Sequence, residues 1–305
     1  MATGTDIQAA FALRADQHFL QRIPRSIWRF VRHYPLGALG AAFIILLLAM
    51  TVLPDLFTNQ DPSFQVIRDR HNPPSGAHWF GTDRLGRDMY TRIVFGARTS
   101  IVVGFGVVVV SSVLSTILGV VSGYTGGWFD TIFQRLIDIG ISLPGLIFII
   151  LFITAFQGMP GGVLYPIIIS VAILISIRLS RVIRAGVIAV KEEQYVDAAY
   201  ALGAGNIRIM AQHIFPNVFA LVLVSASIEV GGAILIESAL SFLGYGIPPP
   251  TASWGRMLNE AREELTRSPH IAIFPGLAIF MTVYSFNMLG DAVRDKLDPR
   301  LRGSK

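Results

Sequence analysis

The sequence predicts an all-α polytopic membrane protein with six transmembrane helices. Hydrophobic residues make up 52% of its 305 positions and charged residues only 15%, whereas a soluble chain carries roughly 25% charged residues. The apolar residues gather in runs long enough to cross a bilayer, and the charges flank these runs. We therefore expect a chain that is solvated mostly by lipid.

The first four spans follow from charge-free length. Residues 36–54 and 101–124 contain no ionisable side chain except a tyrosine, and each is close to the roughly 20 residues that a helix needs to cross about 30 Å of hydrocarbon. Residues 139–177 form a charge-free run of 39 residues. As one helix this run would measure about 58 Å, so it must contain two passes, with the turn at the glycine- and proline-rich residues 157–162.

The last two spans are residues 218–240 and 271–290. The first of these is the doubtful one, because it contains Glu229 and Glu237. An ionised carboxylate is costly inside a membrane and usually faces a partner or a water-filled cavity. Both residues are therefore candidates for the translocation pathway, and the alternative is a structural pair with an arginine or a hydroxyl on another helix.

The distribution of basic residues favours six spans over five. Clusters of basic residues stand at both ends of the chain, which predicts that both termini are cytoplasmic and that the number of crossings is even. Residues 55–98 then lie outside, although they carry six arginines, because five aspartates accompany them. The terminal clusters are Arg14, Arg22, Arg25, Arg29 and Arg32, and Arg294, Lys296, Arg300, Arg302 and Lys305.

A polar island between two long apolar runs, residues 195–217, predicts two short helices with a break between them. Apolar residues recur at helical spacing on either side of Gly203 and Gly205. Pro216 is expected to end the segment just before the next span. A rigid helix–break–helix at a membrane surface suits a docking element for a second protein, and the alternative is an ordinary loop between helices.

Several classes of function are disfavoured by what the chain lacks. It has no cysteine, so no disulfide or thiolate metal site can form. None of its three lysines follows a glycine as in a nucleotide-binding P-loop, no histidine is followed by glutamate as in H-E-x-x-H, and no serine lies in a G-x-S-x-G elbow. The basic residues flank spans instead of forming a stripe, which argues against nucleic acid. The chain is typical of a transport protein whose energy is supplied by another protein.

The island resembles the "EAA" loop of the membrane subunits of ATP-binding-cassette (ABC) importers. That pattern is E-A-A, three residues, a glycine, and a proline thirteen positions later, and the chain matches it with Asp197-Ala198-Ala199, Gly203 and Pro216. Asp197 replaces the usual glutamate, so a salt bridge made by the longer side chain does not carry over with certainty. Residues 80–98, 240–255 and 287–301 are similar to the dipeptide, oligopeptide and nickel permease branch of the same family.

The resemblance implies a type I ABC importer permease fold in the bacterial cytoplasmic (inner) membrane. It implies as partners a second homologous permease, two cytoplasmic ATPases and an extracytoplasmic solute-binding protein. ATP and magnesium would be bound by the ATPases, with no cofactor and no catalysis in this chain. The ATPase-coupling residues would be Asp197, Ala198, Ala199, Gly203, Ala204 and Pro216. Arg87, Asp88 and Trp254 are candidates for docking the binding protein.

The expected organisation follows the same order along the chain. It comprises a cytoplasmic segment (1–35), the first helix (36–54), an extracytoplasmic loop (55–98), a permease core (99–290) with a cytoplasmic coupling loop (184–216), and a cytoplasmic tail (291–305). Short peptides are the leading expected substrate, followed by nickel complexes and glutathione-like or opine-like solutes. Two alternatives stay open: an ion-coupled secondary carrier, which would usually show an internal duplication, and a membrane-embedded enzyme.

Overall fold

The protein is described from a computed structural model that covers residues 28–160 and 162–297. These residues form helices and turns without a β-strand. The long helices are α2 (Pro35–Val52), α3 (Met89–Thr125), α6 (Leu164–Lys191), α9 (Phe215–Phe242) and α11 (His270–Leu297). The short ones are α4 (Gly127–Ser142), α5 (Gly145–Ala155), α7 (Gln194–Ala201), α8 (Asn206–Ile209), a π-helical turn η3 (Met210–Ile214), α10 (Trp254–Ala261), and the 3-10 turns η1 (Pro54–Leu56) and η2 (Ile67–Asp69).

The centre of the bundle is the pair formed by α3 and α6, which pack along most of their length. Small residues let the two backbones approach closely. A Cβ atom added to Gly119 of α3 would lie 2.8 Å from the carbonyl oxygen of Ser180 in α6. Glycine at such a contact is a common device of membrane helix packing.

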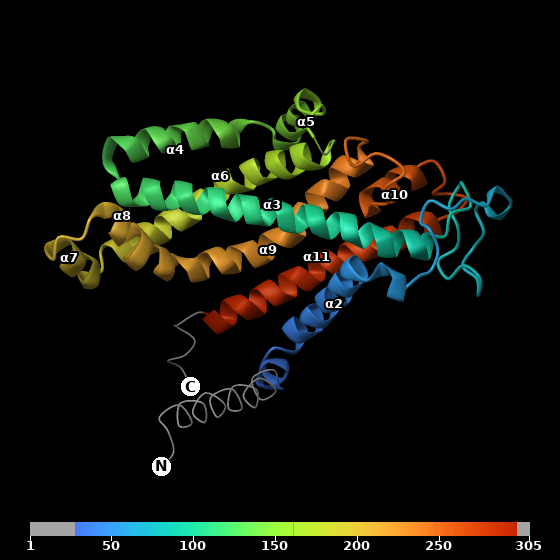
Figure 1. Cartoon of the computed structure of the whole chain (residues 1–305), viewed down its shortest axis with the longest axis horizontal. Helices are drawn as coiled ribbons and strands as arrows, with labels where there is room; N and C mark the ends of the chain where they lie inside the picture. The colour runs from blue at the N-terminus through green and yellow to red at the C-terminus, as the bar shows by residue number, and fades with distance from the viewer. Residues whose placement is uncertain (1–27, 161, 298–305) are drawn as a thin grey trace, which may run out of the picture.

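The remaining long helices build a second group beside this pair. Helix α9 packs against both α3 and α11, and α2 packs against α11 at the edge of the bundle (Figure 1). The end of the bundle that carries α7 and α8 is here called the α7 end. The opposite end, which carries α10 and residues 53–88, is called the α10 end (Figure 1).

The third span was expected to be a single helix that begins at residue 139, but the structure has two helices, α4 and α5, in its place. Helix α4 begins twelve residues earlier, at Gly127, and the chain then bends by 90° before α5. Leu143 and Pro144 form the break in extended conformations. A residue before proline is disfavoured in the helical region, which explains why the charge-free run does not continue as one helix.

The count of spans agrees with the expected fold class. Five described helices are long and apolar enough to cross a membrane, and the bent α4–α5 pair brings the number to six if it counts as one span. Helix α9, which contains both glutamates, is among the five, so the doubtful span is a helix of spanning length.

Several expected boundaries were wrong because helices extend beyond their charge-free cores. Helix α3 begins at Met89, inside the stretch assigned to the loop, and its 37 residues make it about 56 Å long. Helix α6 continues to Lys191, into the expected coupling loop, and α11 continues past residue 290 to Leu297. Charged residues near the end of a spanning helix can keep their head groups in water. Most of the N-terminal segment and residues 298–305 of the tail, with their basic residues, lie outside the described residues.

Candidate coupling segment and mid-bundle pocket

The polar island folds as the expected helix–break–helix. Helix α7 ends in a turn where the N–H of Gly203 donates to the carbonyl of Tyr200 at 2.9 Å and that of Ala204 to the carbonyl of Ala199 at 3.1 Å. Gly203 has a φ of 81°, a conformation that glycine adopts without a side-chain clash. Glycine is therefore required here to turn the chain from α7 into α8.

Pro216 does not end this segment, contrary to expectation. It is an early residue of α9, and the helix is continuous from Asn206 to Phe242. The π-helical turn over Met210–Ile214 precedes it, with the N–H of Phe215 bonded to the carbonyl of Met210. Proline has no N–H to donate to the preceding turn, and a one-turn π-bulge accommodates such a defect within a continuous helix.

The coupling residues suggested by the resemblance differ in how exposed they are. Asp197, Ala198 and Gly203 are exposed, whereas Ala199 is only 8% exposed. Ala204 is half-buried and Pro216 is exposed. In this conformation a partner can reach Asp197, Ala198, Gly203 and Pro216, whereas Ala199 and Ala204 are largely covered.

Two apolar side chains of the segment lie on the surface, which the sequence pattern did not predict. Leu202 is 89% exposed and Ile207 is 79% exposed, one on each side of the Gly203 turn. Their signal in the sequence was the presence of large aliphatic residues inside an otherwise polar island. Large apolar side chains that stand together in water usually mark a protein or membrane contact.

Hydrogen bonds join the C-terminal ends of α3 and α6 and attach the coupling segment to them. Lys191 Nζ donates to the Tyr124 carbonyl at 2.7 Å and lies 5.3 Å from the centre of the Tyr124 ring. The Tyr124 hydroxyl donates to Asn206 Oδ1 at 2.9 Å. These contacts border an open pocket of about 450 Å³ that Asp197 and Tyr200 also line. Asn206 of α8 and Lys191 of α6 are thereby both joined to Tyr124 near the end of α3.

Ion pairs fix α4 against α6. Arg184 donates through Nε to Asp130 at 2.7 Å and Arg181 donates to Asp138. The Asp130 carboxylate also accepts from the Ser122 hydroxyl of α3. Arg181 and Arg184 thus hold α4 against α6.

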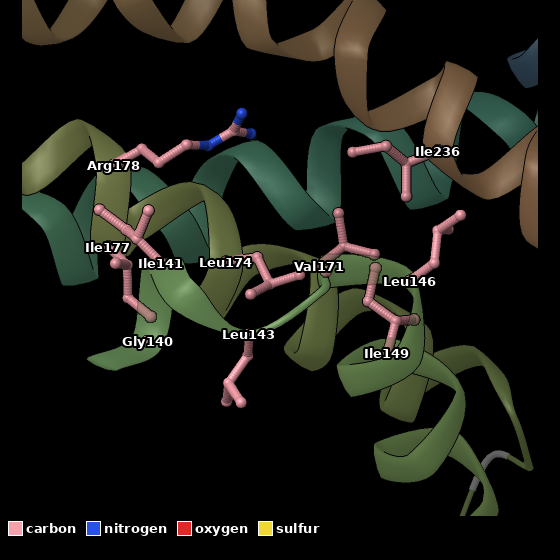
Figure 2. A pocket seen from close by; sticks show the side chains of 11 residues that line it. Gly140, Ile141, Leu143, Leu146, Ile149, Val171, Leu174, Ile177, Arg178 and Ile236 are labelled. Carbon is pink, nitrogen blue, oxygen red and sulfur yellow. The ribbon is translucent and has the colours of Figure 1, made fainter. Parts of the chain in front are cut away.

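A pocket of about 300 Å³ lies at the break between α4 and α5 (Figure 2). Helix α6 forms one wall, and Ile236 of α9 lies across from it. The lining is aliphatic except for Arg178, whose side chain extends along one end of the pocket in Figure 2. Gly140 and Gly145 stand at the two sides of the break and leave room for the side chains of α6.

The two glutamates of α9 have different surroundings. Glu237 is fully buried, and its carboxylate accepts from the Ser241 hydroxyl at 2.7 Å and also from Ser253. Neither glutamate lines the pocket, and the hydroxyl that donates to Glu237 fits the structural alternative for this residue. Glu229 is half-buried and experiences the charge of Arg178. It keeps its place as a pathway candidate.

At the α10 end, Arg87 belongs to a buried ion cluster. Arg87 donates to Asp83 at 2.6 Å and to Glu260 of α10 at 2.7 Å, and Arg92 of α3 donates to the same two carboxylates. Arg87 is only 4% exposed, so a binding protein would not reach it in this conformation, and its docking role remains a prediction. Arg87 holds α10 to the start of α3.

Both carboxylates of the cluster are held in their charged form. Burial would raise the pKa of Asp83, but Arg92 and Arg87, with the backbone N–H groups of Arg87 and Leu85, bring that pKa below its ordinary value. Burial would also raise the pKa of Glu260, but Arg92, Arg87 and Arg256 bring that pKa below its ordinary value. The cluster is therefore ionised at neutral pH.

Trp254 and Asp88 also have internal roles. Trp254 is fully buried and its Nε1 donates to the Ile93 carbonyl of α3 at 3.0 Å, so its docking role also remains a prediction without an exposed side chain to support it. Asp88 caps α3 by accepting from the N–H of Thr91 at 2.8 Å, and it pairs with His78 at 2.9 Å. Asp88 borders an open surface pocket of about 230 Å³ together with Trp79 and Tyr90, and it remains a docking candidate.

Comparisons with known proteins extend over nearly the whole chain. Residues 115–303 match the family of the binding-protein-dependent transport system inner membrane component. The chain is 38% identical over 280 residues to the glutathione transport system permease protein GsiD of Pectobacterium atrosepticum, with 91% of each chain covered. It is 36% identical over 277 residues to the proteins of the same name from Escherichia coli O6:K15:H31 and Shigella boydii serotype 4, with 90% of each chain covered.

Proposed function

Because the chain belongs to the family of binding-protein-dependent transport system inner membrane components, we propose that it carries glutathione or a closely related peptide across the cytoplasmic membrane. It is an ABC importer permease, and the alternative of an ion-coupled secondary carrier is set aside by this membership. The relatives are named as glutathione transport permeases. Glutathione-like solutes therefore take precedence over the dipeptides that were the leading expectation.

The observation that carries the coupling role is the exposed turn between α7 and α8. A rigid turn that presents Leu202 and Ile207 to water, beside Asp197 and Ala198, offers a partner an apolar contact with a charged edge. The partners would be two cytoplasmic ATPases, which bind ATP and magnesium, since this chain has no P-loop lysine. The remaining partners would be a second permease and an extracytoplasmic solute-binding protein.

This assignment orients the chain in the membrane. The α7 end and both termini would be cytoplasmic, and the α10 end with residues 53–88 would face the binding protein. Movement of α7 and α8 with the ATPases would shift α3 and α6 through the contacts of Lys191 and Tyr124. ATP binding can bias the spans only through contacts that differ between the two states.

Uptake by the complete importer tests the proposal. Cells that lack their own glutathione uptake would express this permease with its sister permease, ATPases and binding protein, and radiolabelled glutathione and a radiolabelled dipeptide would be supplied separately. We expect ATP-dependent accumulation of glutathione, abolished when the ATPases carry inactive P-loops. Accumulation of the dipeptide without glutathione would overturn the proposed substrate. Glutathione uptake that survives inactive ATPases would overturn the coupling.

A further inference from the structure

Three arginines recur every third residue on α6, and they differ in their partners. Arg181 is paired with Asp138 of α4, and Arg184 is paired with Asp130 of α4. Arg178 makes no hydrogen bond or ion pair with any side chain in the part of the protein that the structure describes. Its side chain is exposed, so the guanidinium is accessible to another molecule.

Arg178 lies at the middle of its helix. It is fourteen residues after the start of α6 and thirteen before its end, which places it about 20 Å from either end. The carboxylate of Glu229 in α9 acts on Arg178 only electrostatically, without an ion pair. A charged side chain at the middle of a spanning helix is costly, faces a partner or a water-filled cavity, and commonly marks the pathway of a solute.

The pocket at the α4–α5 break is the cavity beside Arg178. The arginine side chain extends along one end of it (Figure 2), and among the described residues that line the pocket it is the only charged one. The glycines at the two sides of the break keep the pocket open. A Cβ atom on Gly140 would lie 3.0 Å from Ile177 Cδ1, and one on Gly145 would lie 3.3 Å from Leu174 Cδ1. The volume of about 300 Å³ falls at the lower end of the range of small-molecule sites.

The lining selects the chemical class of the ligand. A guanidinium pairs with a carboxylate through two parallel hydrogen bonds, and this attraction is stronger in apolar surroundings than in water. The aliphatic wall suits the carbon atoms that carry the carboxylate. Phospholipid headgroups also carry negative charge, but they lie at the membrane surface, whereas Arg178 lies at the middle of α6.

We propose that Arg178 and the pocket at the α4–α5 break form a binding site within the membrane for one carboxylate of the transported solute. This inference rests on the proposed function and names the group through which the permease itself recognises an anionic peptide. Glutathione has two carboxylates. Arg178 binds one of them, and the aliphatic side chains of the pocket contact the carbon atoms next to it.

The site has a direct assay because the chain contains no cysteine. Leu174→Cys, in the wall of the pocket, gives this subunit a single thiol. Its alkylation by N-ethylmaleimide would be followed by mass spectrometry in the purified permease–ATPase complex without binding protein, with and without S-methylglutathione, whose sulfur is blocked. We expect a saturating concentration of the peptide to slow alkylation at least about fivefold. The thiol of Val113→Cys, exposed on α3 and outside the pocket, should react at an unchanged rate.

A matched pair of ligands tests the role of Arg178. In the Leu174→Cys parent, the dimethyl ester of S-methylglutathione, which has no carboxylate, should need an about tenfold higher concentration for half-protection than the free acid, the usual weight of a charge-assisted hydrogen bond. When Arg178→Gln is added, the ester and the acid should protect equally, whereas Arg178→Lys should keep most of the preference for the acid. Arg135→Gln, which changes an exposed arginine of α4, is the matched control and should keep the full preference.

The outcomes separate this inference from the proposed function. Absence of protection in the parent, or a preference for the acid that survives Arg178→Gln, overturns the site even if the importer accumulates glutathione normally. Stronger protection by added phosphatidylglycerol than by the peptide also overturns it and assigns the pocket to lipid. Failure of the complete importer to accumulate glutathione overturns the proposed substrate. Normal elution in size-exclusion chromatography and an unchanged alkylation rate without peptide exclude misfolding of each variant.

Discussion

Arg87 and Glu260 are separated by 173 residues in sequence, and their side chains are joined by a hydrogen-bonded ion pair of 2.7 Å. Arg92 donates to the same Glu260 carboxylate at 2.9 Å. This carboxylate therefore ties α10 both to the turn before α3 and to α3 itself. Buried charges hold the α10 end of the bundle together. At the α7 end, by contrast, charged and apolar side chains are exposed on the protein surface.

Glu260→Gln should destabilise the protein. It leaves two buried guanidinium groups with one carboxylate fewer, and breaking a buried pair costs about 3–5 kcal/mol. We expect a loss of about 3 kcal/mol in unfolding free energy, since Asp83 still compensates part of the charge. Equilibrium unfolding in mixed micelles measures it. Glu263→Gln, an exposed neighbour, is the control, and an equal effect of the two changes would contradict the role of the cluster.

The same cluster predicts a loss of stability in acid. The pKa values of Asp83 and Glu260 in the folded protein lie below their ordinary values of 3.8 and 4.5. A lowered carboxylate pKa contributes stability that is present above the ordinary value and is lost as the pH falls toward the folded value. Stability should be level from pH 7 to about 5 and fall below that. The fall should be shallower in Glu260→Gln, and an unchanged slope in that variant would argue against the assignment.

Leu202→Asp should uncouple the permease from its ATPases. The side chain is exposed, so the change leaves folding intact, but it places a charge where we propose an apolar contact. Co-purification of the ATPases and glutathione uptake should both fall at least about tenfold. Gln194→Glu, also exposed on the same segment, should retain both. Normal uptake by Leu202→Asp at normal expression would count heavily against the proposed contact.

Gly203→Pro should abolish uptake and leave membrane insertion intact. Proline cannot adopt the positive φ of this position and lacks the N–H that donates to Tyr200. Ala199→Arg should act similarly, because it forces a long charged chain between α7 and α8. Protease accessibility of the segment in membrane vesicles would report the displaced turn, and insertion would be followed by immunoblotting. Wild-type uptake in either variant would show that the shape of the turn is not needed.

Asp130 and Arg184 should show coupled energetics. Their pair joins α4 to α6 with two hydrogen bonds, so Asp130→Asn and Arg184→Gln should each destabilise the protein, and the double variant should lose less than the sum. We expect an interaction energy of about 1–3 kcal/mol in the double-mutant cycle. Additive losses would mean that the pair contributes nothing to the attachment of α4.

Much of the coupling segment could be predicted from sequence because its determinants are local. Gly203 and Gly205 interrupt a helical pattern, and no distant contact is needed to turn the chain there. The exposure of Leu202 and Ile207 was not predictable, since helical spacing alone does not say which neighbour covers a given face. The same limit explains Arg87 and Trp254, whose motif context suggested a surface role and whose partners lie more than 150 residues away.

The sequence by itself determined that this chain crosses a membrane on about six helices, carries no nucleotide motif and exposes a helix–break–helix between its fourth and fifth spans. Those features depend on composition, run length and local backbone chemistry. Only the tertiary structure decided that α4 and α5 meet at a right angle, that Glu237 is hydrogen-bonded by a serine, and that Arg87 is paired with Glu260. These features depend on which helices pack together, and helix packing is determined by contacts between side chains that are far apart in the sequence.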